Sequence, residues 1–256
     1  MVPCSKCPAC VARRVSSWSF RLLQEDKVAT SSHFITLTYS NENVPILGSS
    51  GLLTLQPNDV RDFWKRLRFM QNGSCASPIK YYCVGEYGGK THRPHYHALV
   101  FNCDIELVQD AWGLGEIHVG TVSGASVGYT LKYMCKSKRA MRHWYNGRYP
   151  EFSRMSKGLG ISYINEVSAE WHAADLVNRM YCTLAGGVKV AMPRYYKEKL
   201  YFEAEKAAIS EAYRIINHDK QLEKIMRQTT RDVRNEQQAI DAAYDKMYLK
   251  AQKNVL

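Results

Sequence analysis

The chain has 256 residues, of which 45% are hydrophobic and 23% are charged, so it is long enough for one or two globular domains with a sizeable core. Its net charge is +11, and residues 195–256 contribute little to it: they carry 12 basic and 10 acidic side chains, which leaves 23 and 14, a balance of +9, for the rest. This excess is either solvated charge or a surface for a polyanion such as nucleic acid, and the absence of a long apolar run or a signal-peptide core argues against a membrane span or export and for free thiols in a cytoplasm.

Hydrophobic periodicity predicts, in chain order, a helix over residues 11–28, a strand over 33–39, a helix over 57–70, strands over 80–86 and 95–101, a helix over 104–112, a strand over 115–122 and a helix over 124–138. Pro57 fits the first turn of its helix, and Ser123 fits an N-cap. Residues 140–160 are expected to be basic and loop-rich, and a helical tail is expected from about Tyr195. This order predicts an α+β fold, an antiparallel sheet flanked by helices, with a hairpin after residue 86.

The most informative stretch is Pro94-His95-Tyr96-His97, which is followed by apolar residues. In a strand, His95 and His97 leave the same face, spaced to hold one metal ion, while Tyr96 points the other way. Glu86 ends the strand expected to pair with this one, so the hairpin offers its carboxylate as a third ligand. Such a set suits Mg²⁺ or Mn²⁺ and leaves positions for phosphate oxygens. The alternative is two hydrogen-bonded histidines on a half-exposed strand.

A second stretch, residues 128–136, places two tyrosines four residues apart on the helix predicted there. Tyr129 and Tyr133 then share one face, and Lys132 lies beside them. A tyrosine hydroxyl has a pKa of about 10, so a neighbouring ammonium group and a metal-bound phosphate are what make it a nucleophile. We expect Tyr129 and Tyr133 to attack a phosphodiester and Lys132 to stabilise the charge. The alternative is that the tyrosines pack on the sheet and the lysine is solvated.

Together these residues resemble the three motifs of the HUH endonucleases, the metal-and-tyrosine nickases that start rolling-circle replication. The first motif is similar to the strand Phe34–Tyr39, the second to His95-Tyr96-His97 and the third to Tyr129–Lys132. Within that family the chain looks most like the replication initiators of microviruses, particularly the gokushovirus branch. Those proteins also begin with clustered cysteines and basic residues and carry a segment like residues 150–160.

The resemblance implies an RRM-like, five-stranded antiparallel sheet with the histidines on a central strand. It also implies a magnesium- or manganese-dependent endonuclease that nicks single-stranded DNA at an origin, forms a 5′-phosphotyrosine link and leaves a 3′-hydroxyl primer. The expected partners are the replication origin and the host polymerase and helicase, in the host cytoplasm and without a membrane. Residues 1–160 would be the nickase domain, including its N-terminal cysteine-containing helical segment, and residues 161–256 a mostly helical extension of unknown role.

Two further groups of side chains carry weaker expectations. Basic residues near aromatic ones are candidate DNA contacts or solvated charges: Lys65, Arg66, Arg68, Lys136, Arg142, Arg148, Arg154 and Lys157. Cys4, Cys7 and Cys10 have a spacing that suits zinc, but no fourth ligand is evident, so free thiols are the alternative.

Two rival functions remain open from the sequence. One is a transposase or relaxase that uses a single tyrosine for the same chemistry. The other is a non-catalytic nucleic-acid-binding protein whose histidines and cysteines hold structural zinc.

Overall fold

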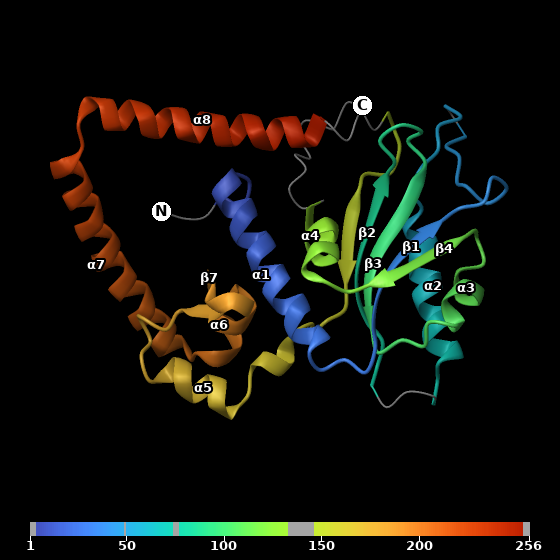
Figure 1. The fold of residues 1–256 in the computed structure, drawn as a ribbon, viewed down its shortest axis with the longest axis horizontal. Helices are drawn as coiled ribbons and strands as arrows, with labels where there is room; N and C mark the ends of the chain where they lie inside the picture. Colours follow the sequence, from blue (N-terminus) through green and yellow to red (C-terminus); the bar gives the residue numbers. More distant parts are fainter. Residues whose placement is uncertain (1–3, 49, 74–76, 133–145, 253–256) are drawn as a thin grey trace.

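The computed structural model describes residues 4–48, 50–73, 77–132 and 146–252. Within these residues the principal feature is a five-stranded antiparallel sheet with the strand order β4-β1-β3-β2-β5 (Figure 1). Its strands are β1 (Ser32–Thr38), β2 (Lys80–Tyr87), β3 (Pro94–Phe101), β4 (Ile117–Thr121) and β5 (Phe152–Met155). The strand with both histidines, β3, is the central one, so each of its residues has neighbours on two sides.

Helices cover both faces of this sheet. One face carries α1 (Pro8–Asp26) and α4 (Gly124–Lys132), and the other carries α2 (Pro57–Met70) and α3 (Leu107–Trp112) (Figure 1). Side chains alternate along β3, so Leu99 packs in the cluster that includes Leu22 of α1, while Val100 packs in the cluster that includes Phe63 of α2. The predicted α+β class and the central position of the histidine strand are confirmed.

Most predicted elements of this region are confirmed. The helix α2 begins at Pro57, and Ser123 caps α4 reciprocally: its hydroxyl accepts from the Ser126 amide, and its own amide donates to the Ser126 hydroxyl. The prediction of a loop over residues 140–160 was wrong for β5. This strand has only four residues and exists because the edge of β2 pairs with it, from Gly85 opposite Phe152 to Tyr82 opposite Met155. The part of the helix predicted beyond residue 132 lies outside the described residues.

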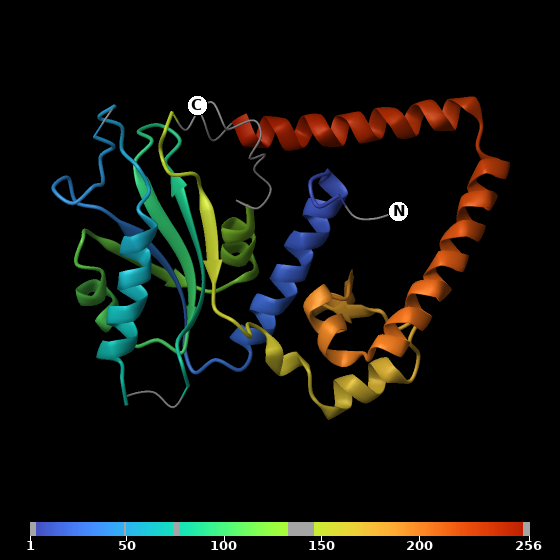
Figure 2. The ribbon, with the colours of Figure 1, turned by 180° about the vertical axis from the view of Figure 1, so that it is seen from behind.

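The C-terminal region is mostly helical. Its elements are η2 (Ile161–Tyr163), α5 (Glu166–Ala173), β6 (Tyr181–Thr183), η3 (Ala185–Gly187), β7 (Lys189–Ala191), α6 (Arg194–Leu200), α7 (Glu203–Arg227) and α8 (Thr230–Gln252). The helical tail predicted from about Tyr195 is therefore confirmed. A third hydrophobic cluster joins this region to α1 through Phe20 and Tyr196, and α7 and α8 extend away from the sheet (Figure 2). No helix among the described residues is long and apolar enough to cross a membrane.

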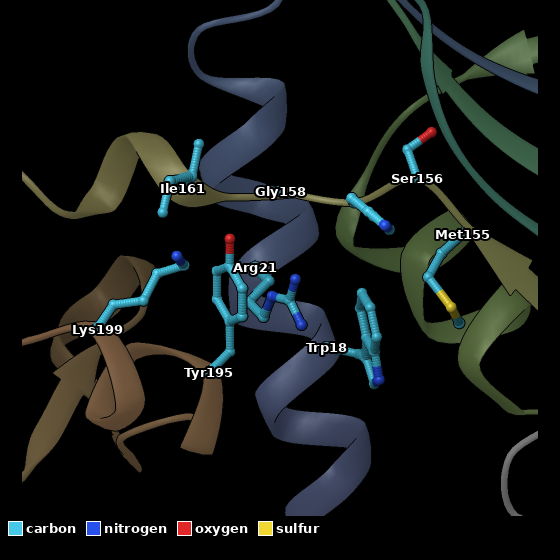
Figure 3. A pocket seen from close by; sticks show the side chains of 9 residues that line it. Trp18, Arg21, Met155, Ser156, Gly158, Ile161, Tyr195 and Lys199 are labelled. Carbon is cyan, nitrogen blue, oxygen red and sulfur yellow. The ribbon is translucent and has the colours of Figure 1, made fainter.

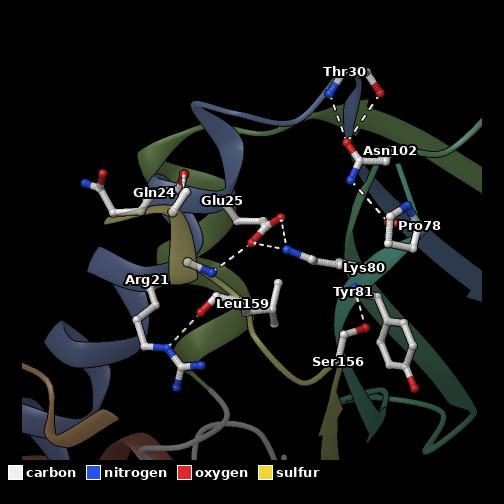
Figure 4. A network of polar contacts seen from close by, with 12 residues as sticks. Arg21, Gln24, Glu25, Thr30, Pro78, Lys80, Tyr81, Asn102, Ser156 and Leu159 are labelled. Carbon is white, nitrogen blue, oxygen red and sulfur yellow. Dashed lines mark hydrogen bonds and ion pairs between the residues drawn. The ribbon is translucent and has the colours of Figure 1, made fainter. Parts of the chain in front are cut away.

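A buried polar network fixes α1 to the sheet. The Glu25 carboxylate, 1% exposed, accepts from Lys80 Nζ at 2.8 Å and from the Gly160 amide at 2.8 Å (Figure 4). Arg21 Nε donates to the carbonyl of Leu159 in the same turn. A buried carboxylate needs such partners, so α1, β2 and the turn after β5 are held together at this point.

Candidate metal and tyrosine site

Three potential metal ligands converge on the face of the sheet that α1 and α4 share. Glu86 on β2 lies directly opposite His95 on β3, and His97 follows two residues along β3 on the same face. The row of apolar side chains on this face, Phe101 and Leu99, is thus interrupted by two imidazoles and a carboxylate. Polar groups in a position that packing would fill with hydrophobic side chains indicate a functional constraint.

The ligand atoms are close enough to bind one ion. Glu86 Oε1 lies 2.9 Å from His95 Nε2 and 3.0 Å from His97 Nε2. One ligand atom from each of the three residues lies within 4.8 Å of the others, and both Glu86 and His97 are buried. The hairpin that the sequence predicted is what sets this arrangement, because it pairs Glu86 with His95.

The other imidazole nitrogens are held by the surrounding strands. His95 Nδ1 donates to the carbonyl of Arg93 at 3.1 Å, which leaves the Nε2 lone pair of the neutral ring free to ligate. His97 Nδ1 lies 2.9 Å from the hydroxyl of Thr36, which is directly opposite on β1. These outer contacts orient metal-binding histidines in proteins generally. The donor set of two Nε2 atoms and a carboxylate oxygen therefore fits a divalent ion.

Without an ion, the same groups interact with one another. Burial lowers the pKa of His95, but the hydrogen bond to Glu86 and the charge of Glu86 raise it more, so the pKa lies above its usual range. Proton and metal therefore compete for the same nitrogen.

The predicted nucleophile lies against this cluster. The hydroxyl of Tyr129, on α4, is 3.5 Å from His97 Nε2, and the two rings meet edge to face with centroids 5.1 Å apart. Phe34 of β1 stacks on the His97 ring at 5.6 Å and contacts Tyr129 as well. Lys132 Nζ lies 5.7 Å from the centre of the Tyr129 ring. Tyr129 is 41% exposed, so its hydroxyl is accessible to a substrate beside the triad. Tyr133 lies outside the described residues.

Three of the predicted DNA contacts lie on α2, behind the sheet as seen from the triad. Lys65 is exposed. Arg66 instead ties α2 to α3, because its guanidinium donates to the carbonyls of Ala111 and Trp112. Arg68 lies 5.5 Å from the ring centre of Tyr81. The structure does not bring these residues together with the triad.

The remaining predicted contacts are scattered. Arg148 is buried, 5.1 Å from the Tyr87 ring, and Arg154 on β5 donates to the carbonyl of Pro57 on the α2 side. Lys136 and Arg142 lie outside the described residues.

Lys157 lines a pocket of about 630 Å³ at the end of β5, between α1 and α6 (Figure 3). Its other cations, Arg21 and Lys199, lie far apart in the sequence, and none of the described lining residues is acidic. The Arg21 guanidinium is held between two rings, 4.2 Å from the centre of Trp18 and 3.9 Å from that of Tyr195. Sequence reasoning missed this combination because only the tertiary fold brings α1 and α6 together.

His118 is a further exposed side chain on the triad's face of the sheet. It lies opposite Thr36 on the edge strand β4, so it is one strand farther from β3. The alternation of β4 could have indicated this face once the pairing with β1 was known.

The three N-terminal cysteines also come together, at the start of α1. Their sulfur atoms lie within 4.8 Å of one another. Hydrogen bonds from the backbone amides of Lys6 and Cys7 lower the pKa of Cys4 to about 7. The Cys10 amide lowers the pKa of Cys7, but the thiols of Cys4 and Cys10 raise it more.

The fold and site thus define an α+β protein with a candidate metal triad on the central strand and a tyrosine helix across it. The chain belongs to the replication-associated protein ORF2 family, whose profile matches residues 32–138. It is 30% identical over 220 residues to the replication-associated protein ORF2 of Spiroplasma virus 4, an alignment that covers 78% of this chain and 67% of the relative.

Two other relatives agree with this assignment. The replication-associated protein VP4 of Bdellovibrio phage phiMH2K is 30% identical over 220 residues, with 77% of this chain and 66% of the relative covered. The replication-associated protein ORF4 of Chlamydia phage 1 is 23% identical over 231 residues, with 78% and 53% covered. The chain therefore spans between about half and two thirds of these relatives. No solved structure matches it.

Proposed function

We propose that the chain takes part in starting phage DNA replication, as the names of its relatives suggest, and that it does so as an HUH-type nickase. In this proposal it cuts single-stranded DNA at an origin, stays linked to the 5′ phosphate through a tyrosine and later rejoins the ends. The observation that carries the proposal is the position of the Tyr129 hydroxyl, 3.5 Å from a ligand nitrogen of the Glu86, His95 and His97 triad.

The triad is proposed to hold Mg²⁺ or Mn²⁺, and the mixed nitrogen and oxygen donors favour Mn²⁺ in vitro. When bound, the ion supplies Lewis-acid polarisation of a phosphate oxygen and orients the scissile phosphate. Glu86 and His97 are buried, which excludes water from one side of the cluster and keeps the ligand atoms in place. Thr36 and the Arg93 carbonyl hold the imidazole rings.

In the cutting step, the Tyr129 oxygen attacks the phosphorus. A new tyrosine O–P bond forms, and the bond from phosphorus to the 3′ oxygen breaks. The tyrosine loses its proton to solvent, and the departing 3′ oxygen gains one. Lys132 lies beside the ring and stabilises the negative charge that develops on the tyrosine oxygen and the phosphate.

Rejoining is the reverse of this step, with a 3′-hydroxyl as the attacking group. We propose that Tyr133 provides a second nucleophile, because it lies four residues from Tyr129 in the sequence. With two tyrosines, one adduct can persist while the other tyrosine cuts again, and no ATP is needed, since each phosphotyrosine bond conserves the energy of the bond that was broken.

The pocket that contains Arg21, Lys157 and Lys199 is proposed to hold backbone phosphates beside the cleavage point. On β2, Tyr82 and Glu86 share a face four residues apart, a separation of about 13 Å along a strand. Trp18, which lines the pocket, lies 5.0 Å from Tyr82 ring to ring. A single strand a few nucleotides long can span this separation. In this arrangement residues 1–160 form the nuclease domain, and residues 161–256 form a helical extension that completes the pocket.

An adduct assay tests the proposal. The full chain is incubated with labelled single-stranded oligonucleotides that tile the replicon encoding it, with Mn²⁺ or with chelator, and the products are separated on a denaturing gel. A metal-dependent protein–DNA band is expected, and it should disappear in the Tyr129→Phe, Tyr133→Phe double variant. Tyr149→Phe is the matched control, because Tyr149 is 43% exposed against 41% for Tyr129.

The single variants distinguish the rival functions. Loss of every joining product in Tyr129→Phe, with no effect of Tyr133→Phe, would favour a single-tyrosine transposase or relaxase. Tight DNA binding without a covalent band on any oligonucleotide would contradict the nickase and favour a binding protein. Host polymerase and helicase are expected partners only if the nick leaves an extendable 3′-hydroxyl.

A further inference from the structure

The N-terminal cysteines form a cluster that the proposed nickase chemistry does not use. Cys4 Sγ and Cys10 Sγ lie 4.0 Å apart, and Cys7 joins them within 4.8 Å. Tetrahedral Zn²⁺ with Zn–S bonds of about 2.3 Å needs sulfur atoms about 3.8 Å apart. The observed spacing is therefore close to that of a zinc site and far longer than a disulfide bond.

The backbone around Cys4 is arranged for a thiolate. Its sulfur accepts hydrogen bonds from the amides of Lys6 at 3.5 Å and Cys7 at 3.2 Å. This turn needs the left-handed conformation of Ser5, whose φ is 61°. A non-glycine residue rarely adopts that conformation, so the turn is held at some cost by what surrounds it.

The other two thiols lie at the beginning of α1. Cys7 is the residue that precedes the helix, and Cys10 lies in its first turn. The amides at a helix N-terminus carry partial positive charge, which favours a thiolate over a thiol. The helix contributes to this site only because three sulfur atoms converge there.

We propose that Cys4, Cys7 and Cys10 bind one Zn²⁺ as thiolates, with a water molecule as the fourth ligand. No other His, Cys, Asp or Glu of the described residues joins this cluster. Binding displaces three thiol protons and leaves the sulfur oxidation state unchanged. Thiolates select zinc, whereas the imidazole and carboxylate donors of the triad suit Mg²⁺ or Mn²⁺. The chain then has two metal sites of different selectivity, and the zinc site ties residues 4–10 to the helix that covers the triad's face of the sheet.

Cobalt titration of the reduced, metal-free full chain tests this site directly. Co²⁺ bound by thiolates gives a sulfur-to-metal charge-transfer band and the intense visible bands of a tetrahedral ion, whereas the triad offers nitrogen and oxygen donors only. One equivalent with the thiolate band is expected, and Zn²⁺ should displace it. The Cys4→Ser and Cys10→Ser variants should lack the band at stoichiometric cobalt while keeping the circular dichroism of the wild type.

The matched control removes the other site. The Glu86→Gln, His97→Gln double variant should keep the thiolate band unchanged, so failure of the nickase proposal and failure of this one are separable. A band that survives in Cys4→Ser or is absent in the wild type would overturn the site. So would a wild-type chain, purified under reducing conditions, whose Cys4 and Cys10 are joined by a disulfide.

Two further measurements address the composition of the site. With zinc present, alkylation of the peptide that contains Cys4, Cys7 and Cys10 should slow sharply, while Cys182, which is buried, should react slowly with or without zinc. A Cys135→Ser variant should bind as tightly as the wild type. Loss of the band in that variant would overturn the water-completed site, since a fourth cysteine would then be a ligand.

Discussion

Replacing Thr36 by Val tests whether the strand next to β3 positions the metal ligands. The Thr36 hydroxyl lies 2.9 Å from His97 Nδ1, on the far side of the ring from Glu86. If Nε2 ligates a metal ion, Nδ1 carries the proton and donates it to Thr36. Valine has nearly the same shape but cannot accept, so the ring loses its orientation and a buried N–H group loses its partner.

The magnitude follows from these contacts. Loss of an outer contact of this type usually weakens metal binding by about 10- to 100-fold, which corresponds to about 1.4–2.7 kcal/mol. The fold itself should lose only about 1 kcal/mol, the usual net contribution of one hydrogen bond. Thr36 touches no substrate in this scheme, so it is a positioning residue, and its effect should exceed the general loss of stability.

Calorimetric titration of Mn²⁺ into Thr36→Val and into Thr38→Val makes the comparison. Thr38 is two residues away on the same face of β1, but its hydroxyl donates to the Glu116 carbonyl and not to the triad. Only Thr36→Val should lose Mn²⁺ affinity, and excess Mn²⁺ should restore adduct formation. If Thr36→Val binds Mn²⁺ within about twofold of the wild type while Glu86→Gln does not bind it, the positioning role is refuted.

Three other predictions concern the pocket, the turn after β5 and the metal. The Lys157→Ala, Lys199→Ala double variant should bind single-stranded DNA more weakly and with a salt dependence lower by about 1.4, because two phosphate contacts of about 0.7 each are lost; Lys65→Ala, on the far face, is the control in a salt titration, and an equal effect there would contradict the pocket. In denaturant unfolding, Gly160→Ala should cost about 1–3 kcal/mol more than Gly158→Ala, because both residues have positive φ but only at Gly160 would a methyl group lie 2.5 Å from a backbone carbonyl of α1; equal losses would contradict this. Chelator should abolish adduct formation but leave far-ultraviolet dichroism of the sheet unchanged, since the ligand groups of the triad hydrogen-bond to one another without an ion; loss of the sheet signal would refute it.

Several features followed from local sequence pattern. The apolar residues of α2, Val60, Phe63, Trp64 and Leu67, are all buried, as their helical spacing predicts. The pairing of Glu86 with His95 followed from two strands and a short loop. Both depend on residues close in the chain, so periodicity and turn length are sufficient to predict them.

Other features could not be predicted in this way. The strand β5 is too short to show alternation and forms only because β2 has a free edge. The basic residues on α2 were grouped with the site by charge alone, whereas the helix lies on the opposite face of the sheet. Arg66 illustrates the reason: its hydrogen bonds go to α3, a partner that charge does not reveal.

The sequence by itself determined the class of fold, the histidine strand and the identity of the three candidate ligands, because alternation and hairpin pairing are local properties. Only the tertiary structure decided what surrounds them. Thr36 reaches His97 because β1 pairs with β3 in one register, and Tyr129 reaches it because α4 packs on that face. Register and packing result from burying the whole sheet at once, so no single segment of sequence specifies them.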